Sequence, residues 1–159
     1  MNIILYEIVE IEGKGNGCRA TQDIKKGTLI LKEKPQMCVE GGRSEWMKPY
    51  WLKEMMKAYQ KMNQAEKDEY SELFHDVPPR LKNDRKAIIK NVFGTKSLKK
   101  RFGNHEKILK IFSILEANGF GCFKANYVAI KSSKFNHSCQ SNAERTQFNK
   151  VSNSTYLHR

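Results

Sequence analysis

The chain has 159 residues, enough for one domain with a substantial core but too few for two independent ones. Hydrophobic residues make up 39% of it and charged residues 29%, which is typical of a folded protein and excludes a disordered one. Its apolar runs are too short for a transmembrane helix. Glu7, Glu10 and Glu12 do not fit a signal peptide, so we expect an intracellular protein of the nucleus or the cytoplasm.

The excess of positive charge has two interpretations. Lys and Arg total 29 against 17 for Asp and Glu, a net charge of +12. This charge either forms a solvated surface or binds a polyanion such as nucleic acid. The four cysteines, Cys18, Cys38, Cys122 and Cys139, form no CxxC pair, so we expect no zinc site and mostly buried thiols.

The first forty residues favour β-structure. Apolar, β-branched runs predict strands at 3–11, 28–33 and 36–40. Glycines in EGKGNG predict a loop over 12–17, and Pro35 separates the last two strands. The stretch Asp23–Gly27 predicts a tight turn that Gly27 ends with a positive φ.

Helical patterns replace the alternation over residues 44–118. Aromatic and methionine side chains recur at helical spacing at Trp46, Tyr50, Met55, Met56 and Tyr59. Asn63 with Glu66 predicts a capping box for a second helix, which Pro78-Pro79 should break. Residues 80–110 are rich in Lys and Arg and we expect them to be partly loop.

The last third returns to β-structure after one more helix. An apolar stripe predicts that helix, with its stop at Asn118-Gly119, from Ile108, Ile111, Phe112 and Leu115. We then expect strands at 127–130, 143–148 and 154–158, a loop at 135–142 and a turn at 149–153. The fold class is therefore α+β: one domain over 1–159, with a helical insert at 44–118 between two β regions.

Two motifs, in this order and with helices between them, carry a resemblance. The first is GKGNGCRA at 13–20, followed by Asp23-Ile24 and Gly27; the second is NHSC at 136–139, followed by Asn142. Together they resemble the SET domain of protein lysine methyltransferases. The helical insert is similar to that of the SET-and-MYND group and its fungal-type relatives, although the ligands of the MYND zinc module are missing. The resemblance implies SET-domain β-sheets around the insert.

The resemblance also implies a chemistry. The family transfers a methyl group from S-adenosylmethionine to a lysine of a histone or another protein, so amine, methyl and sulfur must be aligned and water excluded. By resemblance, the methionine end of the cofactor is lined by Lys14, Gly15 and Asn16. Its adenine is held by Asn136 and His137, and Asn118 is carried over in the same way.

Each of these residues has a structural alternative. The glycine stretch could simply connect a hairpin, and Asn136 and His137 could form a turn that bonds to its own backbone. Cys139 could be a core thiol, because the three cysteines that share zinc with it in some SET domains are absent. His137 is assigned no proton transfer.

The sequence departs from the family at three places. Ser141 stands where the family has proline, and the approach to NHSC over 128–133 is short. Residues 154–159 resemble the strand before a second "DI..GEE" turn and the catalytic tyrosine, so we expect the SET domain to be incomplete at its C-terminus and assign no catalytic residue. Tyr156 comes too early in the motif to replace that tyrosine.

Two hypotheses therefore stay open. The chain is either a SET methyltransferase, inactive in this truncated form, or a non-catalytic SET-like module that binds nucleic acid or a protein partner through its basic insert. A generic basic α+β domain would require both motifs to be coincidental. The surface expected to be positive comprises Arg80, Lys82, Arg85, Lys86, Lys90, Lys96, Lys99, Lys100 and Arg101.

Overall fold

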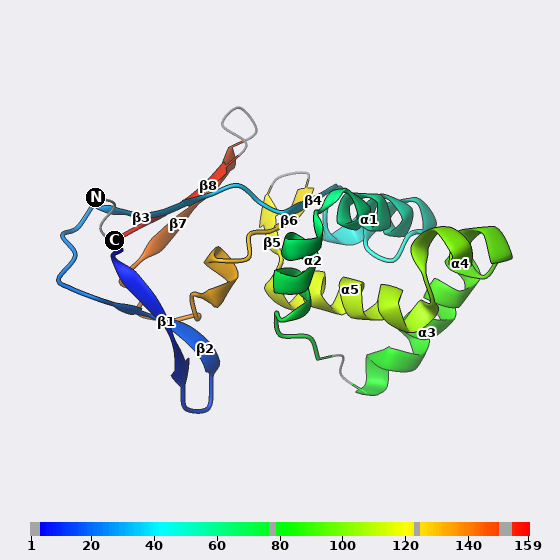
Figure 1. The fold of residues 1–159 in the computed structure, drawn as a ribbon, viewed down its shortest axis with the longest axis horizontal. Helices are drawn as coiled ribbons and strands as arrows, with labels where there is room; N and C mark the ends of the chain where they lie inside the picture. Colours follow the sequence, from blue (N-terminus) through cyan, green and yellow to red (C-terminus); the bar gives the residue numbers. More distant parts are fainter. Residues whose placement is uncertain (1–3, 77–78, 123–124, 150–153) are drawn as a thin grey trace. The chain divides into compact units, whose positions relative to one another are not determined.

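A computed structural model describes residues 4–76, 79–122, 125–149 and 154–159. It divides into two compact units: Met1–Pro35 with Ala129–Arg159, here called the β unit, and Gln36–Val128, here called the helical unit. Antiparallel strands and α-helices confirm the α+β class (Figure 1). Among the described helices, none is long and apolar enough to span a membrane.

The β unit begins with a hairpin of β1 (Tyr6–Ile11) and β2 (Gly15–Ala20), in which Ile11 lies opposite Gly15. Lys14 N donates to Ile11 O at 2.9 Å, and Gly13 and Gly15 have φ values of +70° and +66°. Two left-handed residues so close together favour glycine. The predicted loop over 12–17 is therefore too long, because its second half pairs with β1 as a strand.

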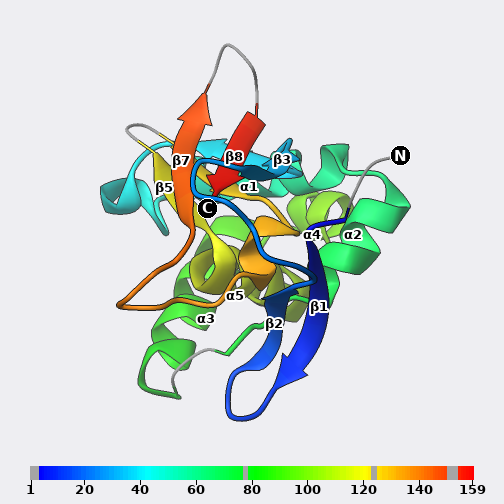
Figure 2. The same ribbon diagram turned by 90° about the vertical axis from the view of Figure 1, so that its left-hand side faces the viewer.

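A three-stranded sheet completes the β unit. β8 (Ser154–His158) lies between β3 (Leu29–Glu33) and β7 (Glu144–Asn149), as Figure 2 shows. The predicted turn before β3 is confirmed: Gly27 has φ +85°, and its N–H donates to Arg159 O at 2.8 Å. Most of the turn expected at 149–153 lies outside the described residues.

The helical unit has its own sheet, in which β6 (Ala125–Val128) lies between β4 (Met37–Glu40) and β5 (Phe120–Cys122). β6 is buried along its whole length, so it shows no alternation that would mark its ends. The strand predicted at 127–130 was accordingly placed two residues too late.

Helix α1 (Pro49–Lys61) starts with proline at its first turn and buries Trp51, Leu52, Met55 and Met56. The predicted helical face was partly wrong, because Tyr50 is 53% exposed and Trp46 precedes the helix. Trp46 is half-buried and packs against the core. Its ring centroid lies 6.0 Å from that of Trp51 and 5.9 Å from that of Phe112.

Helix α2 (Gln64–Ser71) has the predicted capping box. The Asn63 side chain accepts from Glu66 N, and the Glu66 carboxylate accepts from Asn63 N, each at 2.9 Å. The helix ends well before the prolines expected to break it. Pro79 instead begins α3 (Pro79–Phe93), where a missing N–H costs nothing.

The basic stretch 80–110 is more helical than expected, and only residues 94–95 and 103–104 lie between its helices. It holds α3, α4 (Lys96–Phe102) and the start of α5 (His105–Asn118). The side chains of Thr95 and Asn104 cap α4 and α5 by accepting from Leu98 N and Lys107 N. Lys and Arg are good helix formers, so a basic composition does not predict a loop.

The predicted apolar stripe of α5 is confirmed, and α1, α2 and α3 pack against this helix (Figure 1). Tyr70 OH of α2 donates to Ile111 O of α5 at 2.9 Å, and Arg85 of α3 forms a two-pronged ion pair with Glu116. The helices thus occupy the region expected to be an insert; that it is an insert relative to the family stays a prediction.

Candidate functional site

The glycine hairpin and the NHSC loop lie against each other in the β unit, although the sequence separates them widely. Here the glycine hairpin means residues 11–20 and the NHSC loop means residues 135–142. A Cβ placed on Gly17 would lie 2.7 Å from Asn136 Nδ2 and would also clash with the Ile11 side chain. A side chain at Gly17 would require the Ile11 and Asn136 side chains to shift, so glycine allows this close approach of the two motifs.

The hairpin places its candidate residues at one end. Lys14 completes the turn, Gly15 opens β2, and Asn16 lies opposite Glu10. All three candidates are exposed. The turn is held by backbone hydrogen bonding between Lys14 and Ile11, so the Lys14 and Asn16 side chains are not needed to close it.

The NHSC loop follows a short 3₁₀ turn, η2 (Ser132–Lys134). Phe135 leaves this turn, and its ring centroid lies 5.0 Å from that of Tyr6 in β1. Asn136 and His137 are exposed, and His137 Nε2 lies 3.5 Å from Cys139 Sγ. Burial was expected for most cysteines, but Cys38 and Cys139 are exposed.

A buried acid that the sequence did not single out supports this loop. Glu33 of β3 is 6% exposed, and its carboxylate accepts from Lys131 N at 2.9 Å and from Ser132 N at 2.8 Å. Ser132 Oγ donates to the same carboxylate at 3.0 Å. Glu33 lies between Lys32 and Lys34 at the end of β3, which gives no sign of burial, and its partners lie almost a hundred residues away.

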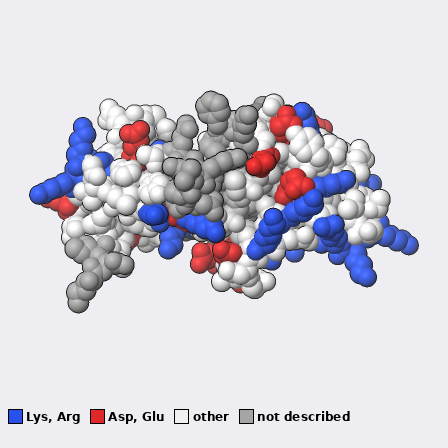
Figure 3. Space-filling model, turned by 90° about the horizontal axis from the view of Figure 1, so that it is seen from above, with Lys and Arg blue, Asp and Glu red and all other residues white. Residues whose placement is uncertain are grey.

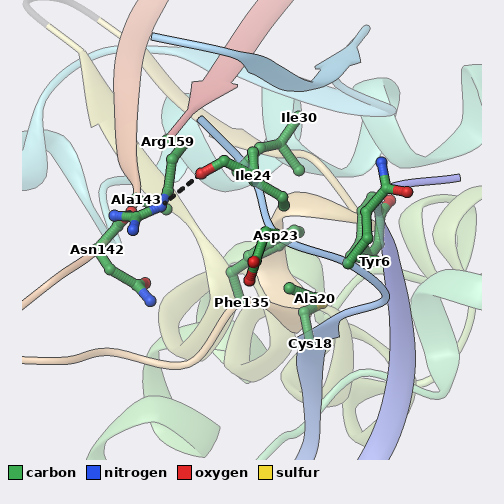
Figure 4. A pocket seen from close by; sticks show the side chains of 11 residues that line it. Tyr6, Cys18, Ala20, Asp23, Ile24, Ile30, Phe135, Asn142, Ala143 and Arg159 are labelled. Carbon is green, nitrogen blue, oxygen red and sulfur yellow. Dashed lines mark hydrogen bonds between the residues drawn. The ribbon is translucent and has the colours of Figure 1, made fainter. Parts of the chain in front are cut away.

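An open cavity of about 290 Å³ borders both motifs (Figure 4). Tyr6 of β1 and Cys18 of β2 line it, with Phe135 and Asn142 of the NHSC loop. The guanidinium of Arg159 closes one side by donating to Ile24 O at 3.2 Å and to Asn142 O at 3.3 Å. The cavity is therefore lined by apolar side chains and, at least as much, by polar ones such as Asp23 and Arg159.

Two acids at this cavity are held in their protonated forms. Burial raises the pKa of the Cys18 thiol to about 11, although the positive charge of Lys134 acts in the opposite direction. Burial also raises the pKa of Tyr6, with smaller contributions from Cys18 and from the negative charge of Glu33. The Cys18 thiol is thus neutral at physiological pH and lines the cavity without acting as an activated nucleophile.

Asn118, the sixth candidate, is the last residue of α5 and belongs to the helical unit. Its Nδ2 donates to Phe74 O at 2.7 Å and to Ile114 O at 2.9 Å. The bond to Phe74 ties the end of α5 to the segment after α2, and the bond to Ile114 lies within α5. They give Asn118 a structural role, and its cofactor role stays a prediction.

In the described part of the chain, no three His, Cys, Asp or Glu side chains gather where they could hold a metal ion. The contact between His137 and Cys139 supplies two such groups and lacks the further ligands of a structural zinc site.

A comparison with protein-family models finds one match, to the SET domain, over residues 15–158. The match runs from the first residue of β2 to the last residue of β8, so it includes the second motif and all of the first except Gly13 and Lys14. No curated protein sequence matches the chain significantly.

Proposed function

Because the chain belongs to the SET domain family, we propose that it is part of a protein-lysine methyltransferase that uses S-adenosylmethionine. The approach of Asn136 to Gly17 carries this proposal, since it joins the two cofactor-binding motifs of the family in one place. Lys14, Gly15 and Asn16 would face the methionine end of the cofactor. Asn136 and His137 would hold its adenine, with Asn118 as a further contact.

The residues present fit such a ligand. Gly17 lets the Asn136 side chain lie close to the hairpin backbone, and the Asn136 amide and the His137 ring are exposed. An amide offers both a donor and an acceptor, as recognition of an adenine edge requires. When bound, the cofactor supplies the methyl group; the chain's own residues bind and orient it.

The lysine side of the reaction needs more than these motifs. The family aligns the substrate amine with a tyrosine and a closing wall, and we propose that no tyrosine among these 159 residues takes that role. Tyr156 supports this proposal, because it lies in β8, the middle strand of a sheet, opposite Lys32 and Thr146. The apolar wall formed by Tyr6 and Phe135 would then border the bound lysine segment.

A methyl-transfer assay tests the proposal. The 159-residue chain, with radiolabelled S-adenosylmethionine and histone or other protein substrates, should transfer little label. Loss of positioning lowers rates by about a hundredfold or more. A longer version, carrying the downstream segment of the gene if one follows, should transfer it. Rapid transfer by the 159-residue chain would contradict the proposal that none of its tyrosines aligns the substrate amine. A longer version that binds cofactor without transferring label would favour a non-catalytic module.

A second candidate function is nucleic-acid binding through the helical unit. Residues 85–105 contain seven Lys or Arg and no Asp or Glu. Arg85 and Lys86 form ion pairs with Glu116 and Glu106, whereas five exposed cations follow along α3 and α4: Lys90, Lys96, Lys99, Lys100 and Arg101. Figure 3 shows Lys and Arg side chains projecting from this part of the molecule.

Salt dependence distinguishes this function from a merely solvated surface. If about five phosphates are neutralised, the logarithm of the affinity for a 20-base-pair duplex should fall with a slope of roughly 4 to 5 against the logarithm of salt. Replacing Lys96, Lys99 and Lys100 by Gln should lower the slope by about 3. The same change at Lys53, Lys57 and Lys61 of α1 is the control for net charge. Equal effects of the two triple variants would contradict a localised surface.

A further inference from the structure

We propose that Glu33 is a positioning residue of the cofactor site: its buried carboxylate fixes η2 and thereby holds Asn136 beside Gly17. The geometric part of this inference concerns the β unit alone. Its consequence for S-adenosylmethionine binding rests on the function proposed above.

Every oxygen of the Glu33 carboxylate accepts a hydrogen bond from a neighbouring group. Glu33 is 6% exposed and Ser132 is 3% exposed, so both lie away from bulk water. One carboxylate oxygen accepts from Lys131 N at 2.9 Å, and the other accepts from Ser132 N at 2.8 Å and Ser132 Oγ at 3.0 Å. A buried charge persists only where hydrogen bonds replace its hydration, and here both oxygens are satisfied.

The bonded amides belong to the start of a helical turn. Lys131 is the N-cap of η2 and Ser132 its first residue, and such N–H groups have no partner within their own turn. The N-cap side chain makes no capping hydrogen bond. Glu33 therefore supplies from another strand the acceptor that a local capping residue ordinarily provides.

From η2 the constraint passes to the NHSC loop by consecutive hydrogen bonds. Lys134 N donates to Lys131 O at 3.1 Å, and Phe135 N donates to Ser132 O at 3.2 Å. Phe135 packs against Tyr6 and directly precedes Asn136. Asn136 is thus held from two sides, by the sheet through Glu33 and by the hairpin through Phe135.

Replacing Glu33 by Gln keeps the size and shape of the side chain, but it removes one of the two oxygens that accept hydrogen bonds from Lys131 and Ser132. The amide would retain one acceptor oxygen and turn an NH₂ group toward donors, so at least one buried N–H would lose its partner. The η2 turn would then adopt other conformations as well, in which the Asn136 side chain no longer lies beside Gly17. Ligand affinity falls in proportion to the population of the competent arrangement.

The direct test is a nuclear Overhauser contact between the Gly17 Hα protons and the Asn136 side-chain amide. The wild-type chain should show it. The Glu33→Gln variant should lose it, and the amides of 131–135 should exchange with solvent about tenfold faster or more, because a hydrogen bond to a charged group is strong. Amides of α5 should be unaffected. A retained contact, or equally faster exchange throughout the chain, would overturn the proposal.

Two further variants keep the result decisive. Glu69→Gln makes the same charge change at an exposed position on α2 and should alter none of these signals. Ser132→Ala removes one of the three donors and leaves the carboxylate in place, so it should speed exchange of 131–135 by a smaller factor. If Glu33→Gln does not fold, unchanged exchange in Ser132→Ala overturns the proposal.

Titration with S-adenosylhomocysteine separates this inference from the proposed function. The affinity of Glu33→Gln should be lower by about tenfold or more, and that of Glu69→Gln unchanged. If the wild-type chain binds and Glu33→Gln binds equally well, the role of Glu33 is refuted while the proposed function stands. If the wild-type chain does not bind, the proposed function fails, and the Overhauser and exchange measurements still decide the role of Glu33.

Discussion

The two units of this chain differ in where they keep their apolar side chains. Of the 24 buried hydrophobic residues in the described part of the chain, 21 belong to the helical unit and three, Ala129, Ile130 and Leu157, to the β unit. In the β unit Ile4, Ile8 and Leu29 are exposed, at 73%, 50% and 43%. The helical unit is held by a packed core, whereas the β unit depends on strand pairing and on a few specific contacts.

This difference predicts which property of the protein, stability or ligand binding, a substitution in each unit should affect. A core residue contributes through many van der Waals contacts, so its loss lowers the free energy of unfolding of the whole unit. A contact such as that of Gly17 with Asn136 buries little, so its loss should alter ligand binding more than stability. Substitutions in the core of the helical unit should therefore lower mainly the free energy of unfolding, and substitutions at the contact in the β unit should lower mainly the affinity for the ligand.

The largest effect is expected in the helical core. Trp51 is fully buried and contacts the rings of Trp46 and Phe112, so Trp51→Ala should lower the free energy of unfolding by about 3–5 kcal/mol. Its neighbour Tyr50 is 53% exposed, and Tyr50→Ala should change it by about 0.5 kcal/mol or less. Urea unfolding measures both. Similar losses from the two variants would refute the difference between core and surface.

A smaller effect on stability and a large one on binding are expected at Gly17. A methyl group there meets Ile11 and Asn136, so Gly17→Ala should cost about 1–3 kcal/mol and lower cofactor affinity by about tenfold or more. Gly42→Ala is the matched control, since a Cβ at Gly42 meets nothing within 4 Å. Calorimetric titration with S-adenosylmethionine compares them. Unchanged affinity in Gly17→Ala would show that the ligand does not use this contact.

Alkaline pH should weaken the helical unit through Tyr70. Burial raises the pKa of this phenol well above 10.0, with a further contribution from Tyr59, so the folded state keeps the proton that the unfolded state loses near pH 10. The contribution of the neutral Tyr70 phenol to the free energy of unfolding is complete below about pH 10 and is lost as the pH rises further. Tyr70→Phe should make the free energy of unfolding less dependent on pH in this range. At neutral pH it should lower that free energy by about 1 kcal/mol, because the hydrogen bond to Ile111 O is lost. Urea unfolding between pH 7 and 11 tests both statements.

The smallest effect concerns a thiol of the β unit. With a pKa of about 11, Cys18 is almost entirely protonated at pH 7, so its alkylation by iodoacetamide should rise about tenfold per pH unit up to pH 10. Mass spectrometry of the labelled peptides follows it beside Cys139, which is exposed. Rapid labelling of Cys18 at pH 7 would mean that the cavity wall around it opens.

Local signals in the sequence predicted local structure. The Asn63 and Glu66 pair, the Gly27 turn and the stripe of α5 all depend on residues within about one helical turn of each other, and all three are confirmed. The prolines at 78–79 and the basic run misled, because proline also starts helices and lysine favours them. Buried β6 was misplaced because it has no alternation.

The candidate site shows the same division. The motifs identified the hairpin and the NHSC loop, and the resemblance predicted that they meet. The role of Glu33 could not be predicted, because its partners Lys131 and Ser132 lie far along the chain and are backbone amides in part. Nor could the hydrogen bonds of Asn118 to Phe74 and Ile114 be foreseen from the step Asn118-Gly119.

Calorimetric titration of the wild-type chain with S-adenosylmethionine, beside Asn136→Ala and Asn91→Ala, tests the central claim most directly. Asn91 lies exposed on α3 and serves as the control for loss of an amide. The account predicts saturable binding to the wild type, unchanged binding to Asn91→Ala and an affinity about tenfold lower for Asn136→Ala, the loss of roughly one good hydrogen bond. No binding by the wild type, or equal binding by all three chains, would contradict a cofactor site built from the glycine hairpin and the NHSC loop.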